Sequence, residues 1–196
     1  MNLSALIHTF DKYSWLWPGL FESYKENWDQ DVKLYLGTDI VPSGPLSSQF
    51  NTLLSGEGEW SDRLTNLLVQ IPTEYLYYSQ EDHWLFKNPP NLAELVDFMD
   101  KKQVLRLQIS PINHYYTLQK GDNIRFFTPN SKYLVSHQPS IWRKDFLLFC
   151  LKSGENPWQN EYEGTKRLNK MNLINRIAIY NYDWYHHKCQ RGSLIS

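Results

Sequence analysis

The sequence predicts an α/β protein whose mixed, mostly parallel sheet is flanked by helices in a single domain. Three observations carry this prediction. The first forty residues have the pattern of strand, helix and strand, which is the βαβ unit that builds parallel sheets. A second helical pattern over 60–71 leads directly into the apolar run YLYYSQ at 75–80. The length of 196 residues fits one ordinary domain.

The first βαβ unit comes from three short stretches. LSALIHTF at 3–10 is apolar and runs into the polar residues DKYS, as a strand entering a loop does. The segment 15–28 has apolar residues at helical spacing. DVKLYLGTD at 31–39 then predicts a second strand that ends in Gly-Thr-Asp.

The next segments predict a long loop and a second helix and strand. Residues 42–59 are rich in Pro, Gly and Ser, which predicts a loop. In WSDRLTNLLVQI, Ser61 is a candidate N-cap residue for the helix. The strand that follows ends in two adjacent acids, Glu81 and Asp82, and then His83 and Trp84.

The second half of the chain gives mixed signals. NPPNLAELVDFMDKK predicts an Asn-capped helix and QVLRLQI a strand, while QKGDN predicts a hairpin turn within 109–127. Residues 133–154 predict a short strand, a turn at Pro139 with Ser140 as a candidate N-cap, and a helix that ends at Gly154. A polar loop from 155 leads into a basic helix, RIAIYNY predicts a late strand, and a polar tail begins at about residue 183.

Composition narrows the classes of function. The chain has 20 Lys and Arg against 21 Asp and Glu, so no overall charge favours nucleic acid or an anionic membrane. The 8 Trp and 13 Tyr exceed the needs of a core and suit sugar faces, nucleobases or protein partners. Two cysteines without a framework of spacings indicate a reducing compartment, so we expect a cytoplasmic protein. We expect neither a signal peptide, because the N-terminus has no basic leader, nor a transmembrane segment.

Three strand ends carry polar, chemically active residues. They are HTFDKYS, GTD and QEDHW, and the carboxyl ends of parallel strands meet at one edge of a sheet, where ligands bind. Adjacent acids point to opposite sides of a strand, so one of them can bind a hard cation directly while the other binds through water or a sugar hydroxyl. The alternative is that Glu81 and Asp82 belong to an acidic N-cap or to a solvated turn before Pro89.

The order of segments along the chain resembles a known enzyme family. The βαβ unit, the WSDRL helix and the strand ending in an acidic pair are followed by SHQPSIWRKD and NPWQNEYEGT. This order, over about residues 3–167, resembles small GT-A type glycosyltransferases, particularly those among the surface-glycan genes of bacteria and large DNA viruses. The resemblance implies a GT-A fold, which is Rossmann-like, and transfer of a sugar from a nucleotide donor, with a uridine diphosphate sugar expected, to a glycan acceptor.

The resemblance implies a metal site at the acidic pair. GT-A enzymes hold Mn²⁺ or Mg²⁺ at a D-x-D motif, but here the frame has Gln80 in the place of the first acid. Asp82 is the expected metal ligand, and Glu81 the second candidate. A histidine near the C-terminus completes the site in several GT-A families, and we assign this ligand to His186 of the pair His186 and His187; the alternative is a solvated pair.

The resemblance also implies a nucleotide site around the first two strand ends. The candidates are His8, Thr9, Phe10, Asp11, Asp39, Arg63, Lys188 and Arg191. Of these, Lys188 and Arg191 belong to the tail and could fold over the diphosphate as a lid. His8 and Phe10 could instead pack in the core, and Arg63 could form a surface ion pair.

Transfer with inversion needs a base for the acceptor hydroxyl. The family pattern matches Glu161 best, with Glu163 as the second candidate; both could instead be ordinary acids of a helix turn. Gln138, Trp142 and Trp158 are the candidates for contacts with sugar or acceptor, although Trp142 could be a core residue. The leading hypothesis is therefore a metal-assisted, inverting glycosyltransferase that binds no nucleic acid.

Two other classes of function are compatible with parts of this pattern. The first is a non-catalytic module that binds a glycan or nucleotide, which the imperfect D-x-D motif and the many aromatic residues would suit. The second is a metal-dependent nuclease, which the absence of a basic surface disfavours.

Overall fold

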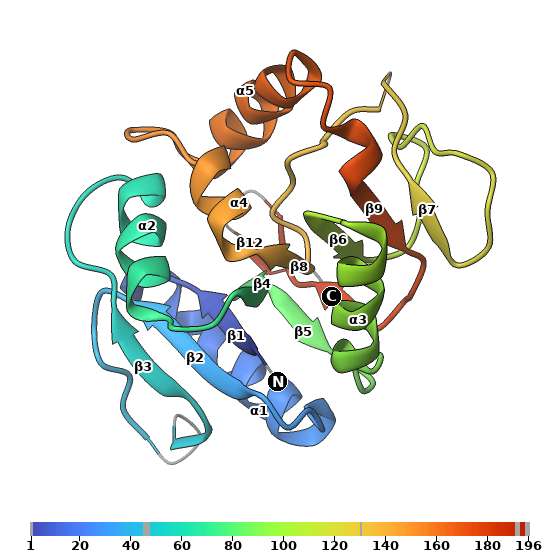
Figure 1. Ribbon diagram of the computed structural model, residues 1–196. Coiled ribbons are helices and arrows are strands. Elements are labelled where there is room, and N and C mark those ends of the chain that lie inside the picture. The colour runs from blue at the N-terminus through green and yellow to red at the C-terminus, as the bar shows by residue number, and fades with distance from the viewer. Residues whose placement is uncertain (1, 45–47, 130, 191–192, 195–196) are drawn as a thin grey trace.

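One eight-stranded sheet runs through the molecule, with helices on both faces (Figure 1). The computed structural model describes residues 2–44, 48–129, 131–190 and 193–194. The strands of this sheet are β1 (Leu3–His8), β2 (Lys33–Thr38), β3 (Asn51–Leu54), β4 (Tyr75–Gln80), β6 (Arg106–Ile109), β7 (Ile124–Phe126), β8 (Ser140–Arg143) and β9 (Ile177–Tyr180). The helices are α1 (Trp17–Asn27), α2 (Trp60–Gln70), α3 (Leu92–Lys102), α4 (Lys144–Cys150) and α5 (Pro157–Asn169), with 3-10 turns η1 (Asp11–Leu16) and η3 (Ile174–Arg176).

The sheet is mixed and mostly parallel, as the sequence predicts. Its order is β3-β2-β1-β4-β8-β6-β9-β7. The first four strands are parallel to one another and β6 is parallel to β9, but β8 runs antiparallel between β4 and β6, and β7 is antiparallel to β9. The two reversed strands mark where the simple alternation of helix and strand stops.

Alternate side chains along the strands pack into two separate hydrophobic cores, one on each face of the sheet. On one face, α1 and α3 cover residues such as Ala5, Ile7 and Tyr77. On the other face, α2, α4 and α5 cover residues such as Leu6 and Tyr78. Successive side chains of a strand point to opposite faces, so a strand that is buried on both faces is apolar along its whole length.

The helix boundaries confirm one predicted cap and correct two others. Asn91 caps α3, and its side chain accepts hydrogen bonds from the backbone N–H groups of Ala93 and Glu94. Helix α2 begins at Trp60 with Glu59 in the N-cap position, so Ser61 lies inside its first turn. Ser140 is the first residue of β8 and caps no helix.

Two segments expected to be irregular form strands. The predicted loop over 42–59 contains β3 at the sheet edge, where its side chains are half-buried or exposed, which explains its weak apolar pattern. The segment from 183, predicted to be a polar tail, contains β10 (Tyr185–His187), which pairs with β5 (His83–Leu85). Trp184 anchors this segment, because it is fully buried and its Nε1 donates a hydrogen bond to the backbone oxygen of Ile109. β11 (Cys189–Gln190) and β12 (Ser193–Leu194) pair with each other beyond it.

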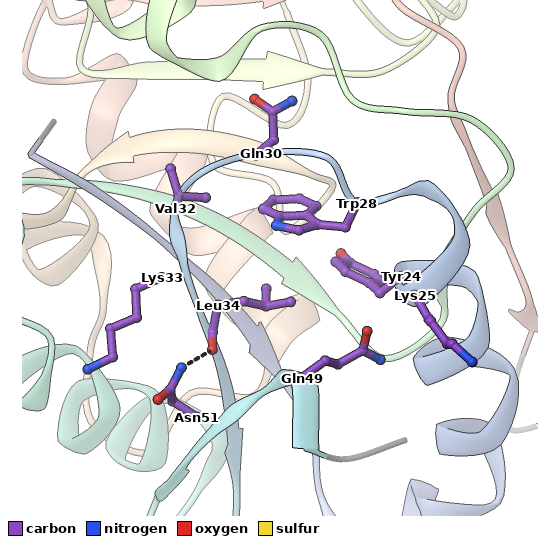
Figure 2. Close-up of a pocket in the computed structure, with 9 residues that line it drawn as sticks. All are labelled: Tyr24, Lys25, Trp28, Gln30, Val32, Lys33, Leu34, Gln49 and Asn51. Atoms are coloured by element: carbon purple, nitrogen blue, oxygen red, sulfur yellow. Dashed lines mark hydrogen bonds between the residues drawn. The ribbon is translucent and has the colours of Figure 1, made fainter. Parts of the chain in front are cut away.

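A small pocket of about 350 Å³ lies at the amino edge of β2 and β3 (Figure 2). Tyr24 and Trp28 stack there with ring centroids 5.4 Å apart, and none of the described residues that line the pocket is acidic. The acidic strand ends lie at the opposite edge of the sheet. No helix in the described part of the chain has the length and apolar character needed to cross a membrane.

Candidate active site

The strand register brings the three chemically active strand ends together. His8, the last residue of β1, lies opposite Gly37 of β2 and Gln80 of β4. The residues that follow, at 9–11, 38–39 and 81–82, therefore leave the sheet at the same carboxyl edge, as the sequence predicts.

A cleft of about 960 Å³ opens at this edge. Helix α5 and the loop that carries His137 form its other wall. Nine residues predicted from the sequence line the cleft: Phe10, Asp11, Asp39, Arg63, Glu81, Asp82, Gln138, Trp158 and Glu161.

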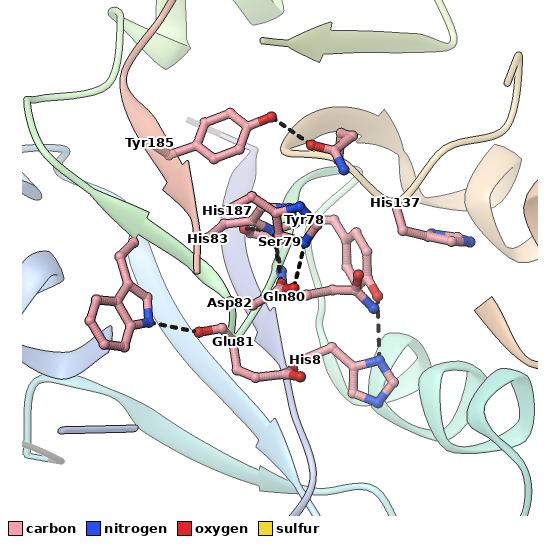
Figure 3. Close-up of polar contacts among 12 residues, drawn as sticks. His8, Tyr78, Ser79, Gln80, Glu81, Asp82, His83, His137, Tyr185 and His187 are labelled. Atoms are coloured by element: carbon pink, nitrogen blue, oxygen red, sulfur yellow. Dashed lines mark hydrogen bonds and ion pairs between the residues drawn. The ribbon is translucent and has the colours of Figure 1, made fainter. Parts of the chain in front are cut away.

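Two histidines, His83 and His187, lie against Asp82, and their rings stack with centroids 5.2 Å apart (Figure 3). His187 Nε2 donates a hydrogen bond to Asp82 Oδ2 at 2.6 Å, and His83 Nδ1 is 3.7 Å from Asp82 Oδ1. Oδ1 is buried and accepts no hydrogen bond from the described residues. One ligand atom from each of the three side chains lies within 4.8 Å of the other two, so the group could hold a metal ion.

The charges of this group follow from burial and proximity. Burial raises the pKa of Asp82, but the neighbouring His83 and the hydrogen bond from His187 outweigh it, so the pKa lies below its usual range. The hydrogen bond to Asp82 raises the pKa of His187. Burial lowers the pKa of His83 to about 4, so its imidazole is neutral at pH 7 and its Nδ1 accepts the backbone N–H of Gln80.

Glu81 differs in charge from its neighbour. Its side chain is buried in the cleft wall, and burial, with a smaller effect from Asp82, raises its pKa to about 8. Trp84 Nε1 donates a hydrogen bond to the backbone oxygen of Glu81 at 3.1 Å, and this bond holds the turn at residues 81–82. Two adjacent acids therefore hold one proton between them at neutral pH.

The first two strand ends form a charged corner of the cleft. Asp39 Oδ1 accepts the backbone N–H of Asp11 at 2.7 Å, and Asp39 Oδ2 pairs with Arg63 at 3.0 Å. Burial raises the pKa of Asp39, but these two hydrogen bonds bring it below its usual value. The Arg63 guanidinium lies 5.2 Å from the ring centroid of Phe10, so Phe10 presents an aromatic face beside a fixed cation.

Glu161 enters the cleft from α5. Its Oε1 accepts the backbone N–H of His137 at 2.7 Å. Burial raises the pKa of Glu161, although this hydrogen bond acts in the opposite direction. Trp158, one turn earlier on the helix, lines the cleft and is 74% exposed. Gln138 Oε1 accepts a hydrogen bond from Tyr185 at 2.6 Å.

Four predicted site residues lie behind or away from the cleft surface. His8 is buried beneath it, with its ring 5.1 Å from that of Phe10. Thr9 is buried and accepts a hydrogen bond from Trp17. Trp142 is fully buried in the core, which corrects its assignment as a sugar contact. Glu163 pairs with Lys166 at 3.0 Å on the exposed side of α5 and does not line the cleft.

The structure moves the C-terminal histidine of the candidate site from His186 to His187. His186 is exposed and stacks on Phe86, because neighbouring residues of β10 point to opposite sides. His187 takes the place beside Asp82 that we expected for His186. The backbone N–H of Lys188 binds the Asp82 backbone oxygen at 2.7 Å, and its ammonium lies 6.0 Å from the Trp84 ring centroid. Arg191 lies outside the described residues.

Sequence reasoning did not place His83 or His137 at the site. His83 is next to the acids in sequence, but adjacency does not show that its ring returns to Asp82. His137 belongs to the SHQPSIWRKD segment, but no other feature of the sequence marks it as a site residue. Only the pairing of β5 with β10 brings His187 opposite His83.

No family model matches the sequence, and no curated protein is similar to it in sequence. Among solved structures, Staphylococcus aureus TarS residues 1–349 in complex with UDP matches with a TM-score of 0.63 at 18% identity, over 94% of this chain and 60% of that chain. The same protein with UDP-GlcNAc gives a TM-score of 0.60 at 19% identity, over 99% and 60%. CMP:2-keto-3-deoxy-manno-octonic acid synthetase with CTP gives 0.55 at 11% identity, over 98% and 94%.

These similarities establish a fold. These neighbours have a GT-A-like, Rossmann-like fold, and the chain described here has the same mixed, mostly parallel sheet flanked by helices. The chain spans 60% of the length of TarS 1–349 and 37% of the longer TarS structure.

Proposed function

We propose that this protein is a glycosyltransferase that moves a sugar from a uridine diphosphate sugar to a hydroxyl of a glycan, with inversion and with the help of a divalent metal. One observation carries the proposal. Two half-buried carboxyl groups with opposite pKa shifts, Asp82 and Glu161, line the same cleft. Environments that push carboxyl pKa values apart are typical of sites where one acid stays charged and the other exchanges a proton.

The nucleotide would occupy the corner formed by Phe10, Asp39 and Arg63. The aromatic face of Phe10 suits stacking with a base, and the oxygens of Asp39 suit hydrogen bonds to the N–H and O–H groups of a nucleoside. The UDP and UDP-GlcNAc complexes of TarS support uridine as the base. A glycan is proposed as the acceptor because the exposed ring of Trp158 in the cleft suits a sugar face.

The donor set beside Asp82 fits a divalent cation. Asp82 Oδ1 is a buried carboxylate oxygen without a hydrogen bond from the described residues, and His187 offers an imidazole nitrogen next to it. His83 Nδ1 would be a further ligand only by giving up the hydrogen bond that it accepts from the Gln80 backbone. Imidazole with carboxylate suits Mn²⁺ better than Mg²⁺, which prefers oxygen ligands. When bound, the cation supplies positive charge that offsets the charge of a diphosphate leaving group. Glu81 is protonated near pH 7 and so is the second choice as a ligand.

Glu161 would act as the base. The acceptor oxygen forms a bond to the anomeric carbon while the bond from that carbon to the diphosphate oxygen breaks, and the acceptor proton passes to the carboxylate of Glu161. A base works best when its pKa is close to the working pH, and burial moves the pKa of Glu161 in that direction. Trp158 offers an exposed ring for the acceptor beside it. The pairing of Glu163 with Lys166 on the other side of the helix makes Glu161 the better choice of the two predicted candidates.

A thermal shift panel tests the proposal. We expect UDP to raise the melting temperature more than ADP or CDP, and manganese to increase the effect, because a ligand of the native state stabilises it. The Arg63→Ala variant should lose most of the UDP shift and keep the unliganded melting temperature close to that of the wild type. A panel in which no nucleoside diphosphate changes the melting temperature would refute nucleotide binding.

A further inference from the structure

A buried hydrogen-bond network connects the base candidate to the far end of its helix. It begins at Arg167 in the last turn of α5, whose guanidinium binds both oxygens of Glu155, at 2.6 and 2.9 Å. Glu155 Oε2 accepts a hydrogen bond from Asn160 Nδ2 at 2.7 Å. Asn160 Oδ1 lies 3.1 Å from His137 Nε2.

Asn160 has no freedom in how it makes these bonds. It is fully buried, and its Nδ2 group uses both of its hydrogens, one for Glu155 and one for the backbone oxygen of Cys150 at 2.9 Å. Its Oδ1 can therefore only accept, so His137 must carry its proton on Nε2. Burial lowers the pKa of His137 to about 3, which keeps the ring neutral with that single proton.

The network ends on Glu161. The same His137 whose ring binds Asn160 donates its backbone N–H to Glu161 Oε1 at 2.7 Å. Asn160 and Glu161 are neighbours on α5, so the helix and the loop at 136–138 are joined at two adjacent positions. Fixing the ring of His137 also fixes its backbone N–H, and thus the place of the carboxylate.

We infer that Asn160, held by Glu155 and Arg167, is a positioning residue that holds Glu161 through His137 in the geometry required of the base. This inference rests on the proposed function of Glu161. Without the anchor, the hydrogen bond to Glu161 would weaken and the carboxylate would be less well placed, and small displacements of a catalytic group cost large factors in rate.

Other charges also act on Glu161 and would remain in place. Arg106 of β6 and His187 of β10 favour its ionised form, and the hydroxyl of Tyr78 lies near it from β4. Ser136, in the same loop as His137, also donates a hydrogen bond to Glu161, so a change in the pKa of Glu161 after loss of Asn160 would report the two hydrogen bonds from this loop.

Asn160→Ala, assayed by UDP release from UDP-GlcNAc and UDP-glucose with water as acceptor, tests the inference. We expect kcat to fall by about 10-fold or more, with the donor KM within about 2-fold of the wild type. Arg167→Ala should act in the same direction, and Arg167→Lys, which keeps a charge for Glu155, should recover part of the loss. Lys166→Ala is the matched control, because Lys166 is adjacent and also pairs with an acid but does not reach His137. A kcat within 2-fold of the wild type, or an equal loss in UDP affinity, would overturn the inference.

A second measurement does not depend on turnover. The pKa of Glu161, followed by carboxyl carbon NMR, should be higher in Asn160→Ala than in the wild type and unchanged in Lys166→Ala. An unchanged pKa in Asn160→Ala overturns the inference even if the wild type is active. Absence of UDP release from the wild type, together with the expected pKa change, would instead refute the proposed function and leave the network's effect on Glu161 in place.

Discussion

Asp82 and His187 are 105 positions apart in the sequence, yet Asp82 Oδ2 and His187 Nε2 are separated by 2.6 Å. The contact exists because β10 returns beside β5 and places His187 opposite His83. A strand end and the C-terminal segment thus build one group of potential metal ligands.

Replacement of His187 should weaken manganese binding. We expect His187→Ala to raise the Kd for Mn²⁺ by about 10-fold or more, since even outer partners of metal sites have effects of that size. His186→Ala is the matched control, because His186 lies on the same strand but faces Phe86. Isothermal titration of both variants decides the assignment, and equal losses in the two would contradict it.

Manganese binding should strengthen as the pH rises. The hydrogen bond to Asp82 raises the pKa of His187, so the ring keeps its proton to a higher pH than a free histidine and must release it to bind a metal. Titrations between pH 6 and pH 8 should show a falling Kd and proton release. A Kd that is independent of pH over this range would argue against His187 as a ligand.

Glu81→Gln should stabilise the protein at alkaline pH. The pKa of Glu81 is about 8 in the folded chain against 4.5 for an ordinary glutamate, so the folded state holds a proton that the unfolded state releases. Stability is therefore lost as the pH rises from about 4.5 towards 8. The neutral glutamine avoids this loss, and we expect a gain on the order of 1–4 kcal/mol at pH 8 that disappears near pH 4. Urea unfolding at both pH values tests this, and an equal effect at both would show that burial of the charge is not the cause.

Glu161→Gln should abolish most of the transfer activity. Removing a general base costs about 10²–10⁴-fold in rate, and UDP binding should survive because Glu161 lies on α5, on another wall of the cleft from the corner of Asp39 and Arg63. In the wild type, activity should fall with decreasing pH at a value above the ordinary glutamate pKa, because burial raises the pKa of Glu161. Glu163→Gln is the control and should stay close to the wild type, since its side chain faces solvent beside Lys166.

The sequence was sufficient for the parts of the fold that depend on local pattern. Strands buried on both faces and amphipathic helices have clear periodicity, so β1, β2, β4 and α1 to α3 could be predicted. Edge strand β3 could not, because it is short and both of its end residues, Asn51 and Leu54, are exposed, so no alternation of apolar and polar residues marks it. The reversal of β8 depends on which strands it pairs with, which no local pattern records.

The same division applies to the candidate site. Asp82, Asp39 and Glu161 lie at strand ends or in a motif, and all three line the cleft. The choice between His186 and His187 depends on which side of β10 each side chain faces. The sequence predicts a polar tail here and no strand, so it does not record this side. The link from Arg167 to His137 passes through buried contacts between residues that are separated in sequence, so it is visible only in the structure.

The most direct test of the central claim is the release of UDP from UDP-GlcNAc and UDP-glucose by the wild type and by Asp82→Ala, with and without manganese. We predict that the wild type releases UDP from at least one donor, that manganese increases the rate, and that Asp82→Ala abolishes this increase while its circular dichroism spectrum is unchanged. Nucleotide binding without any release would indicate a non-catalytic binding module. Release that is equally fast in Asp82→Ala, with or without manganese, would contradict the account.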